Sequence, residues 1–312
     1  MKPVIYHYVR RETAGLPYFP YLRLEDFRRQ LDWFAAKYGF VSRAEFEHWV
    51  NGGEAPEGVL LTFDDGLRDH LDQVLPEILV RDIWGLFYVA SVPLVEERYL
   101  DVHKVHLAVG RLGGKVALQW LEVNFPELVE RGRTIDCGSG AYGDQRSSDA
   151  TRFVKRLFNW QLLPEERQEA LDRFFNFAFD GLPPLWNSFY MDTAGIRKLL
   201  DAGMGVGPHG HTHAVLSLLD EDRQKQEILQ SCDVLESLGG NRSWGYCYAH
   251  GIRDAFSPAS ERIAAEVGCP FAFAMADQDV TKPLKQSDTF ALPRHNCNRF
   301  PFGAVSYEAT SE

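Results

Sequence analysis

The sequence alternates short apolar runs with segments whose apolar residues recur every three or four positions. Val59–Phe63 is an unbroken apolar and β-branched run of the kind that forms a buried strand. Leu24–Tyr38 instead places its apolar side chains at helical spacing and is followed by Gly39, a residue type that commonly ends a helix. Because strands that alternate with helices favour a parallel sheet or barrel, the sequence predicts an α/β fold.

This alternation is interrupted over residues 101–186. Within that stretch, Gly132–Asp149 is rich in glycine and serine and is predicted to be a loop, whereas Pro164 opens a helix. The alternation resumes from Thr193. A chain of 312 residues is long for one domain, yet α/β barrels often reach this length as a single domain. We therefore expect one barrel domain over residues 1–312, with a helical insertion at about residues 101–186.

Charge and cysteine usage narrow the classes of function. With 33 Lys and Arg against 44 Asp and Glu, the formal net charge is −11, which argues against a nucleic-acid or anionic-membrane partner. No apolar run reaches the ~18 residues of a transmembrane helix. The widely spaced cysteines form no CxxC motif and are typical of reduced thiols. They are Cys137, Cys232, Cys247, Cys269 and Cys297. Residues 1–8 read into a strand without a signal peptide, so we expect a cytoplasmic protein.

Two adjacent carboxylates, Asp64 and Asp65, follow the predicted strand Val59–Phe63. Barrel active sites lie at the carboxyl ends of strands, so this pair is a candidate for catalysis. Two carboxylates close together repel, and a positive group is expected between them. The alternative is an acidic turn in which Gly66 supplies a positive φ.

Three histidines alternate at His209, His211 and His213. Neutral imidazoles are the commonest metal ligands, and with Asp65 they would form a catalytic site with open positions for water. If the loop makes a helical turn, His209 and His213 face the same way and His211 points elsewhere. With Asp64 as the proton acceptor, the predicted reaction is metal-assisted hydrolysis of an amide or ester. The alternative is a solvated loop with a chance histidine cluster.

Both segments resemble motifs of a known family. Leu61–Gly66 resembles the first motif of the polysaccharide deacetylase family, also called the NodB homology domain or carbohydrate esterase family 4, and His209–His213 resembles the second. The resemblance spans roughly residues 1–100 and 187–300. It implies a distorted (β/α)7 TIM-like barrel. The chain looks most like the intracellular deacetylases of bacterial O-antigen gene clusters.

The resemblance also implies roles for individual residues. Asp64 would be the general base, and Asp65, His209 and His213 would be the metal ligands. The usual metal of the family is zinc, with cobalt or nickel sometimes preferred. The usual reaction removes an acetyl group from an N-acetylated sugar, and a backbone N–H of the third motif helps to hold the oxyanion.

The chain departs from the family pattern in three places. Gly210 stands where serine or threonine is usual. The third motif is at best Cys247–Gly251 and lacks the usual arginine and proline, so Arg294 is the candidate to pair with Asp64 in their place. The fifth motif, which supplies the general acid, has no clear match, and His295 is the candidate for that role. Equally open is a structural ion pair for Arg294 and a hydrogen-bonded core position for His295.

Two further histidines are assigned to the substrate side of the site. His7 ends the first predicted strand and is expected at the site mouth, and His250 is expected to line the substrate cleft through its side chain or backbone. The resemblance thus implies a metal-dependent deacetylase acting on a nucleotide-linked or lipid-linked sugar during O-antigen or lipopolysaccharide synthesis. The alternatives are a hydrolase of another C–N bond, such as a deformylase or ureide amidohydrolase, and a non-catalytic sugar-binding relative.

Overall fold

The computed structural model describes residues 1–13, 15–135, 142, 147–284 and 289–305. The chain divides into two compact units. The first, here called the barrel unit, comprises Met1–Arg11, Tyr21–Arg98 and Trp186–Val305. The second, the helical unit, contains Glu12–Pro20 and Tyr99–Leu185. Within the described ranges, no helix combines the length and the apolar character needed to cross a lipid bilayer.

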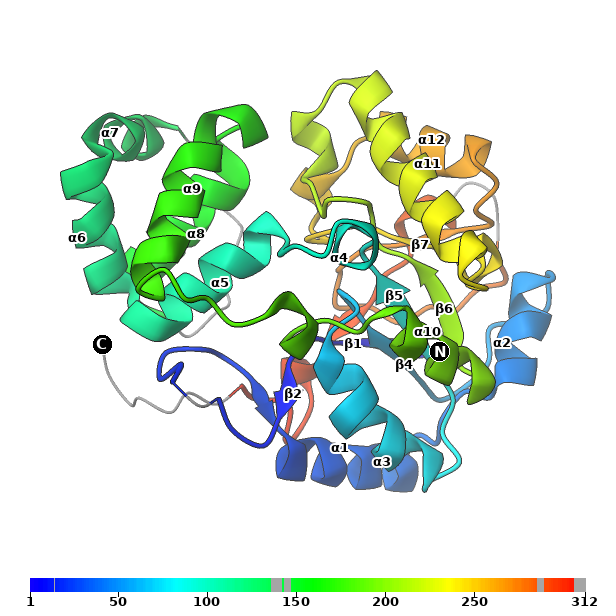
Figure 1. Ribbon diagram of the computed structural model, residues 1–312. Coiled ribbons are helices and arrows are strands. Elements are labelled where there is room, and N and C mark those ends of the chain that lie inside the picture. The colour runs from blue at the N-terminus through cyan, green and yellow to red at the C-terminus, as the bar shows by residue number, and fades with distance from the viewer. Residues whose placement is uncertain (14, 136–141, 143–146, 285–288, 306–312) are drawn as a thin grey trace. The chain divides into compact units, whose positions relative to one another are not determined.

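A parallel sheet forms the centre of the barrel unit, in the strand order β6-β5-β4-β1-β9 (Figure 1). Its strands are β1 (Lys2–Tyr6), β4 (Val59–Phe63), β5 (Gly85–Val89), β6 (Gly205–Pro208) and β9 (His295–Asn296). Every residue of β4 and β5 is buried, which explains the continuous apolar run in the sequence. The carboxyl ends of β1, β4 and β6 carry the residues discussed below.

Two further pairs of strands extend the parallel arrangement. β7 (Tyr246–Cys247) pairs with β8 (Ala272–Phe273), and β2 (Val9–Arg10) pairs with β3 (Leu22–Arg23). A parallel bridge from Phe273 to Leu292 joins β8 to the segment that leads into β9. Parallel pairing therefore runs from β6 through β9 to β8 and β7. The predicted α/β fold class, with a parallel central sheet, is confirmed.

Amphipathic helices cover the strands of the barrel unit (Figure 1). They are α1 (Leu24–Lys37), α2 (Arg43–Val50), α3 (Leu75–Leu79), α4 (Val92–Val95), α10 (Thr193–Asp201), α11 (Glu221–Ser237) and α12 (Pro258–Glu266). α1 buries its predicted apolar face, and the Gly39 amide donates to the Phe34 carbonyl at 3.0 Å just beyond its end. The Asp220 side chain caps α11 by accepting from the Arg223 amide at 2.8 Å.

Prolines mark the first turn of two helices. Leu71–Leu79 forms a π-helical turn over His70–Val74 followed by α3, with Pro76 in the first turn of α3. Val116–Val129 is likewise split between two helices, because Pro126 begins the second. A proline lacks the amide that a helix interior needs but is tolerated in the first turn.

The helical unit is built from five described α-helices and one π-helical segment, Leu157–Gln161. The α-helices are α5 (Asp101–Leu112), α6 (Gly114–Asn124), α7 (Pro126–Thr134), α8 (Asp149–Arg156) and α9 (Pro164–Ala178). Phe158 and Phe174 stack in its core with ring centroids 5.9 Å apart. Residues 12–20 join this unit, and the Tyr18 amide donates to the Gly110 carbonyl at 2.8 Å. The sequence pattern alone does not separate residues 12–20 from the barrel unit. The expectation of a single barrel domain with one insertion stays a prediction.

Candidate functional site

The chain turns sharply where β4 ends. Asp65 has φ +79° and Gly66 has φ +72°, so two successive residues adopt the left-handed region. A side chain at Gly66 would place its Cβ 2.6 Å from Val89. A left-handed aspartate is uncommon, and such residues gather at functional sites. The turn overcomes the opposite facing of successive strand residues, so that Asp64 and Asp65 both reach the region at the end of β6.

Asp65, His209 and His213 converge as the sequence predicted. Asp65 Oδ1 lies 3.3 Å from His209 Nε2 and 3.2 Å from His213 Nε2, and all three residues are buried. One ligand atom from each lies within 4.8 Å of the others. Two ligands bound at 2.0–2.1 Å to one tetrahedral zinc ion are about 3.3 Å apart. The spacing and the donor types therefore fit a divalent transition metal.

The ring of His209 is oriented by a backbone contact. Its Nδ1 donates to the Cys247 carbonyl at 2.9 Å, because a carbonyl oxygen can only accept. This fixes the tautomer and directs Nε2 toward Asp65. His211 points away from the cluster, as expected, with Nδ1 2.7 Å from Ser91 Oγ.

Asp64 is held by a buried arginine. Arg294 donates from Nη1 to Asp64 Oδ1 and from Nη2 to Asp64 Oδ2, each at 2.8 Å, and Nη1 also reaches the Thr62 hydroxyl at 3.0 Å. Arg294 is 1% exposed. Burial alone raises the pKa of Asp64, but the charges of Arg294 and His209 outweigh it and lower that pKa to about 2. The carboxylate therefore stays ionised at neutral pH.

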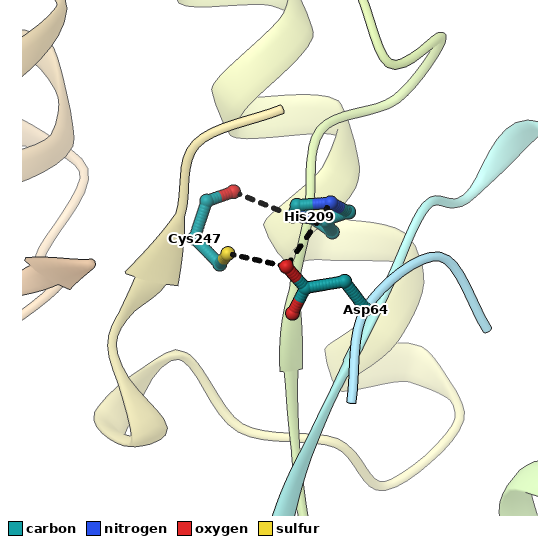
Figure 2. Close-up of side chains that lie close together, drawn as sticks. All are labelled: Asp64, His209 and Cys247. Carbon is teal, nitrogen blue, oxygen red and sulfur yellow. Dashed lines mark hydrogen bonds and ion pairs between the residues drawn. The ribbon is translucent and has the colours of Figure 1, made fainter. Parts of the chain in front are cut away.

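A second group of ligand-type residues comprises Asp64, His209 and Cys247 (Figure 2). Cys247 Sγ lies 3.7 Å from Asp64 Oδ2, and His209 Nε2 lies 4.0 Å from the same oxygen. However, Arg294 Nη2 lies 2.8 Å from both Asp64 Oδ2 and Cys247 Sγ. A metal cation bound there would face the guanidinium charge directly, so the Asp65 group is the better metal site.

Of the remaining predicted histidines, two lie beside the ligand cluster and one does not. His7 Nε2 lies 4.0 Å from Asp65 Oδ2 at 43% side-chain exposure, and the His250 ring lies 4.8 Å from the His213 ring. His250 is also left-handed, with φ +60°. His295 is not brought to the cluster, because its Nε2 bonds Asp279 Oδ1 at 2.8 Å. It follows Arg294 directly, and successive strand residues face opposite sides.

Sequence reasoning missed one histidine beside the site. His70 is fully buried in the π-helical turn, and its Nε2 donates to the His7 carbonyl at 2.9 Å. Burial lowers the pKa of His70 to about 4, so the ring is neutral at pH 7. The sequence around His70 reads as an apolar helix and does not indicate this role. The contact that defines the role joins residues 63 positions apart.

The chain resembles known proteins both in part of its sequence and in its fold. Residues 184–272 match the family model described as polysaccharide deacetylase. This segment is similar in sequence to the polysaccharide deacetylase family. It contains two of the three proposed metal ligands, together with Cys247 and His250. No curated protein sequence matches the chain significantly.

Solved deacetylase structures share the fold. The Streptococcus pyogenes deacetylase PplD, in complex with acetate, aligns with a TM-score of 0.56 at 13% identity, covering 100% of this chain and 94% of that one. IcaB from Ammonifex degensii aligns at 0.52 with 15% identity, covering 94% and 90%. A de-N-acetylase from Aggregatibacter actinomycetemcomitans aligns at 0.53 with 14% identity, covering 94% and 93%. At these identities the likeness establishes the polysaccharide deacetylase fold for nearly the whole chain.

Proposed function

We propose that this chain is a metal-dependent deacetylase that removes the N-acetyl group from a sugar. The observation that carries the proposal is the convergence of Asp65, His209 and His213 beside an ionised Asp64. A metal ion held by those three ligands would polarise the acetyl carbonyl. It would also lower the pKa of bound water, so that the water loses a proton readily and attacks the carbonyl. The family match and the shared fold support the same reaction class.

Asp64 fits the role of general base. Its carboxylate is ionised and lies next to the ligand cluster, where it would accept the proton of the attacking water. The two hydrogen bonds from Arg294 fix the orientation of the carboxylate, which a single flexible contact would not do. The protein thereby uses Arg294 where the family places an arginine in the third motif.

His7 fits the role of proton donor better than His295 does. The leaving amine needs a proton from a group that faces the substrate, and His7 is partly exposed beside Asp65. His295 is 13% exposed and engaged with Asp279. The His7 backbone is held by His70, which would keep the imidazole at the site entrance. The backbone amide of His250 is the proposed donor to the oxyanion.

Finer proposals concern the metal, the substrate and the location. We propose zinc as the metal, with cobalt or nickel as substitutes, because the ligands are one carboxylate and two imidazoles. We propose a nucleotide-linked or lipid-linked sugar of O-antigen or lipopolysaccharide synthesis as the substrate, and the cytoplasm as the location. The four described cysteines are free, which supports a reducing compartment. Cys137 lies outside the described residues.

The test is acetate release by the zinc-loaded and cobalt-loaded protein from N-acetylated nucleotide sugars and lipid-linked sugars. Turnover of at least one acetylated sugar, lost in Asp64→Asn while the metal is retained, is the expected result. Turnover of only formamides or ureides would assign another C–N hydrolase. Sugar binding without turnover under every metal would assign a non-catalytic sugar-binding protein.

A further inference from the structure

Glu227 of α11 makes three hydrogen bonds to the segment that joins the two histidine ligands. We call residues 209–213 the ligand loop. Glu227 Oε2 accepts from the His211 amide at 3.1 Å and from the Thr212 amide at 2.9 Å. Glu227 Oε1 accepts from the Thr212 hydroxyl at 2.7 Å. Both carboxylate oxygens of Glu227 therefore bond the middle of the loop.

The backbone of the ligand loop has an uncommon conformation that contacts with other parts of the chain must stabilise. Gly210 has φ +85° and His213 has φ +63°, so left-handed residues stand on both sides of the segment bound by Glu227. A left-handed histidine persists only where its surroundings stabilise it. Gly210 also lacks the hydroxyl that the family usually has at that position, and Thr212 supplies a hydroxyl two residues later.

The opposite side of the ligand loop is held by the start of α4. The Ser91 amide donates to the Gly210 carbonyl at 3.1 Å, and the Val92 amide donates to the His211 carbonyl at 3.0 Å. The Ser91 hydroxyl also bonds the His211 ring. On that side the carbonyls of the loop accept hydrogen bonds, whereas on the other side the amides of the loop donate hydrogen bonds to Glu227. The loop is thus fixed from two directions. Glu227 holds its backbone amides with a carboxylate, and the Glu96 carboxylate lies 3.6 Å from the His211 ring.

We propose that Glu227 is a positioning residue that sets the spacing of His209 and His213 for metal binding. The inference rests on the proposed metal-dependent function. Glu227 bonds neither of these two imidazoles in the structure, so it acts through the loop backbone. A carboxylate makes stronger hydrogen bonds to amides than a neutral acceptor does, which suits a loop with left-handed residues.

The experiment compares Glu227→Ala, Glu227→Gln and the matched control Glu236→Ala. Glu236 lies on the same helix, but its carboxylate bonds Arg242 instead of the ligand loop. For each full-length protein, the affinity for Zn²⁺ is measured by chelator competition and the visible spectrum is recorded with Co²⁺. We expect Glu227→Ala to bind Zn²⁺ about 10–100-fold more weakly and to show an altered Co²⁺ spectrum. Glu227→Gln retains an acceptor and should recover most of the affinity, and Glu236→Ala should match wild type.

The thermal unfolding midpoint of each metal-free protein is measured as well. A positioning role predicts a loss of Zn²⁺ affinity in Glu227→Ala that exceeds any loss of stability, whereas a general structural role predicts a lower midpoint with unchanged affinity. Unchanged Zn²⁺ affinity and Co²⁺ spectrum in Glu227→Ala would overturn the inference while leaving the proposed function intact. Wild-type protein that binds neither metal would instead contradict the proposed function. If Glu227→Ala does not fold, Thr212→Val removes one bond of the same set, and Thr212→Ser restores the hydroxyl. The inference then requires weaker Zn²⁺ binding in the first variant and recovery in the second.

Discussion

The two sides of the site are built in different ways. The ligand side, formed by Asp65, His209 and His213, comes from the turn after β4 and from one short loop after β6. The base side brings Asp64 together with Cys247 in β7 and Arg294 just before β9. Local sequence motifs specify the first side. The second requires parts of the barrel unit that are far apart in sequence to pack together.

The comparison shows how neighbouring carboxylates acquire different tasks. Asp64 faces a guanidinium, which keeps it charged but leaves no room for a metal cation. Asp65 faces two imidazoles, which would bind a metal ion in their neutral form. One peptide bond separates the two, and the left-handed turn at Asp65 directs them to different partners. Contrasting environments of this kind separate the roles of paired carboxylates.

The strongest way to break the ligand side is to remove one of its imidazoles. In His209→Ala, bound metal should fall from about one ion per chain to none, because only two protein ligands remain. Elemental analysis of the purified protein measures this directly. His295→Ala is the matched control, since that ring bonds Asp279 away from the cluster, and it should keep its metal. Equal metal content in the two variants would contradict the assignment of the ligands.

The base side is isolated by changing its carboxylate alone. Asp64→Asn should lower kcat for acetate release about 10²–10⁴-fold, the usual contribution of a general base. Its metal content should equal that of wild type, because Asp65 and both histidines remain. Parallel activity and metal measurements check both statements. Activity near the wild-type level would remove Asp64 from the mechanism.

Removing the arginine tests how the base stays charged. In metal-free Arg294→Met at pH 7, the free energy of unfolding should fall by about 3–5 kcal/mol, because a buried carboxylate loses its partner. In wild type the pKa of Asp64 is about 2, below its ordinary value near 3.9, so its contribution to stability is present above about pH 4 and is lost as the pH falls toward 2.

In the variant, burial raises the pKa of Asp64, and acid protonates the unpaired carboxyl. The stability gap between Arg294→Met and wild type should therefore narrow from pH 7 to pH 4. Urea unfolding at the two pH values measures that gap, with Arg242→Met as a control for loss of a partly exposed arginine. If the difference in free energy of unfolding between wild type and Arg294→Met grows from pH 7 to pH 4, Arg294 does not stabilise the charged form of Asp64.

The smallest effect is expected at the cysteine. Cys247→Ser keeps a hydrogen-bonding group next to Arg294 and should change the free energy of unfolding by about 0.5–1.5 kcal/mol. Zn²⁺ affinity should stay unchanged, because His209 bonds the backbone carbonyl of residue 247 and not its side chain. Chelator competition on the variant checks this. A large loss of affinity would place the thiol among the metal ligands.

The sequence predicted the parts of the site that depend on local patterns. The β/α alternation led to the parallel fold, and the spacing of His209 and His213 led to the ligand pair. Arg294 was predicted as the partner of Asp64 because the family arginine is missing, and the structure places the two in contact. His295 was assigned by the same elimination, but strand geometry turns it away.

Other features could not be read from the sequence. His70 and Glu227 act through hydrogen bonds to backbone groups, and backbone groups carry no residue-specific pattern. Residues 12–20 join the helical unit through contacts with residues about 90 positions later, such as that of Tyr18 with Gly110. Such pairings depend on tertiary packing and have no local signature.

The position of Arg294 also has a consequence for protein synthesis. Arg294, whose guanidinium keeps the Asp64 carboxylate ionised, lies 230 residues after Asp64 along the chain. The three metal ligands are complete once His213 has left the ribosome, but the arginine follows about 80 residues later, several seconds at ordinary rates of translation. A nascent chain therefore has every metal ligand before it can form the buried pair that sets the charge of its base. On the proposed roles, the base would reach its ionised, arginine-paired state only after the segment that leads into β9 has been synthesised.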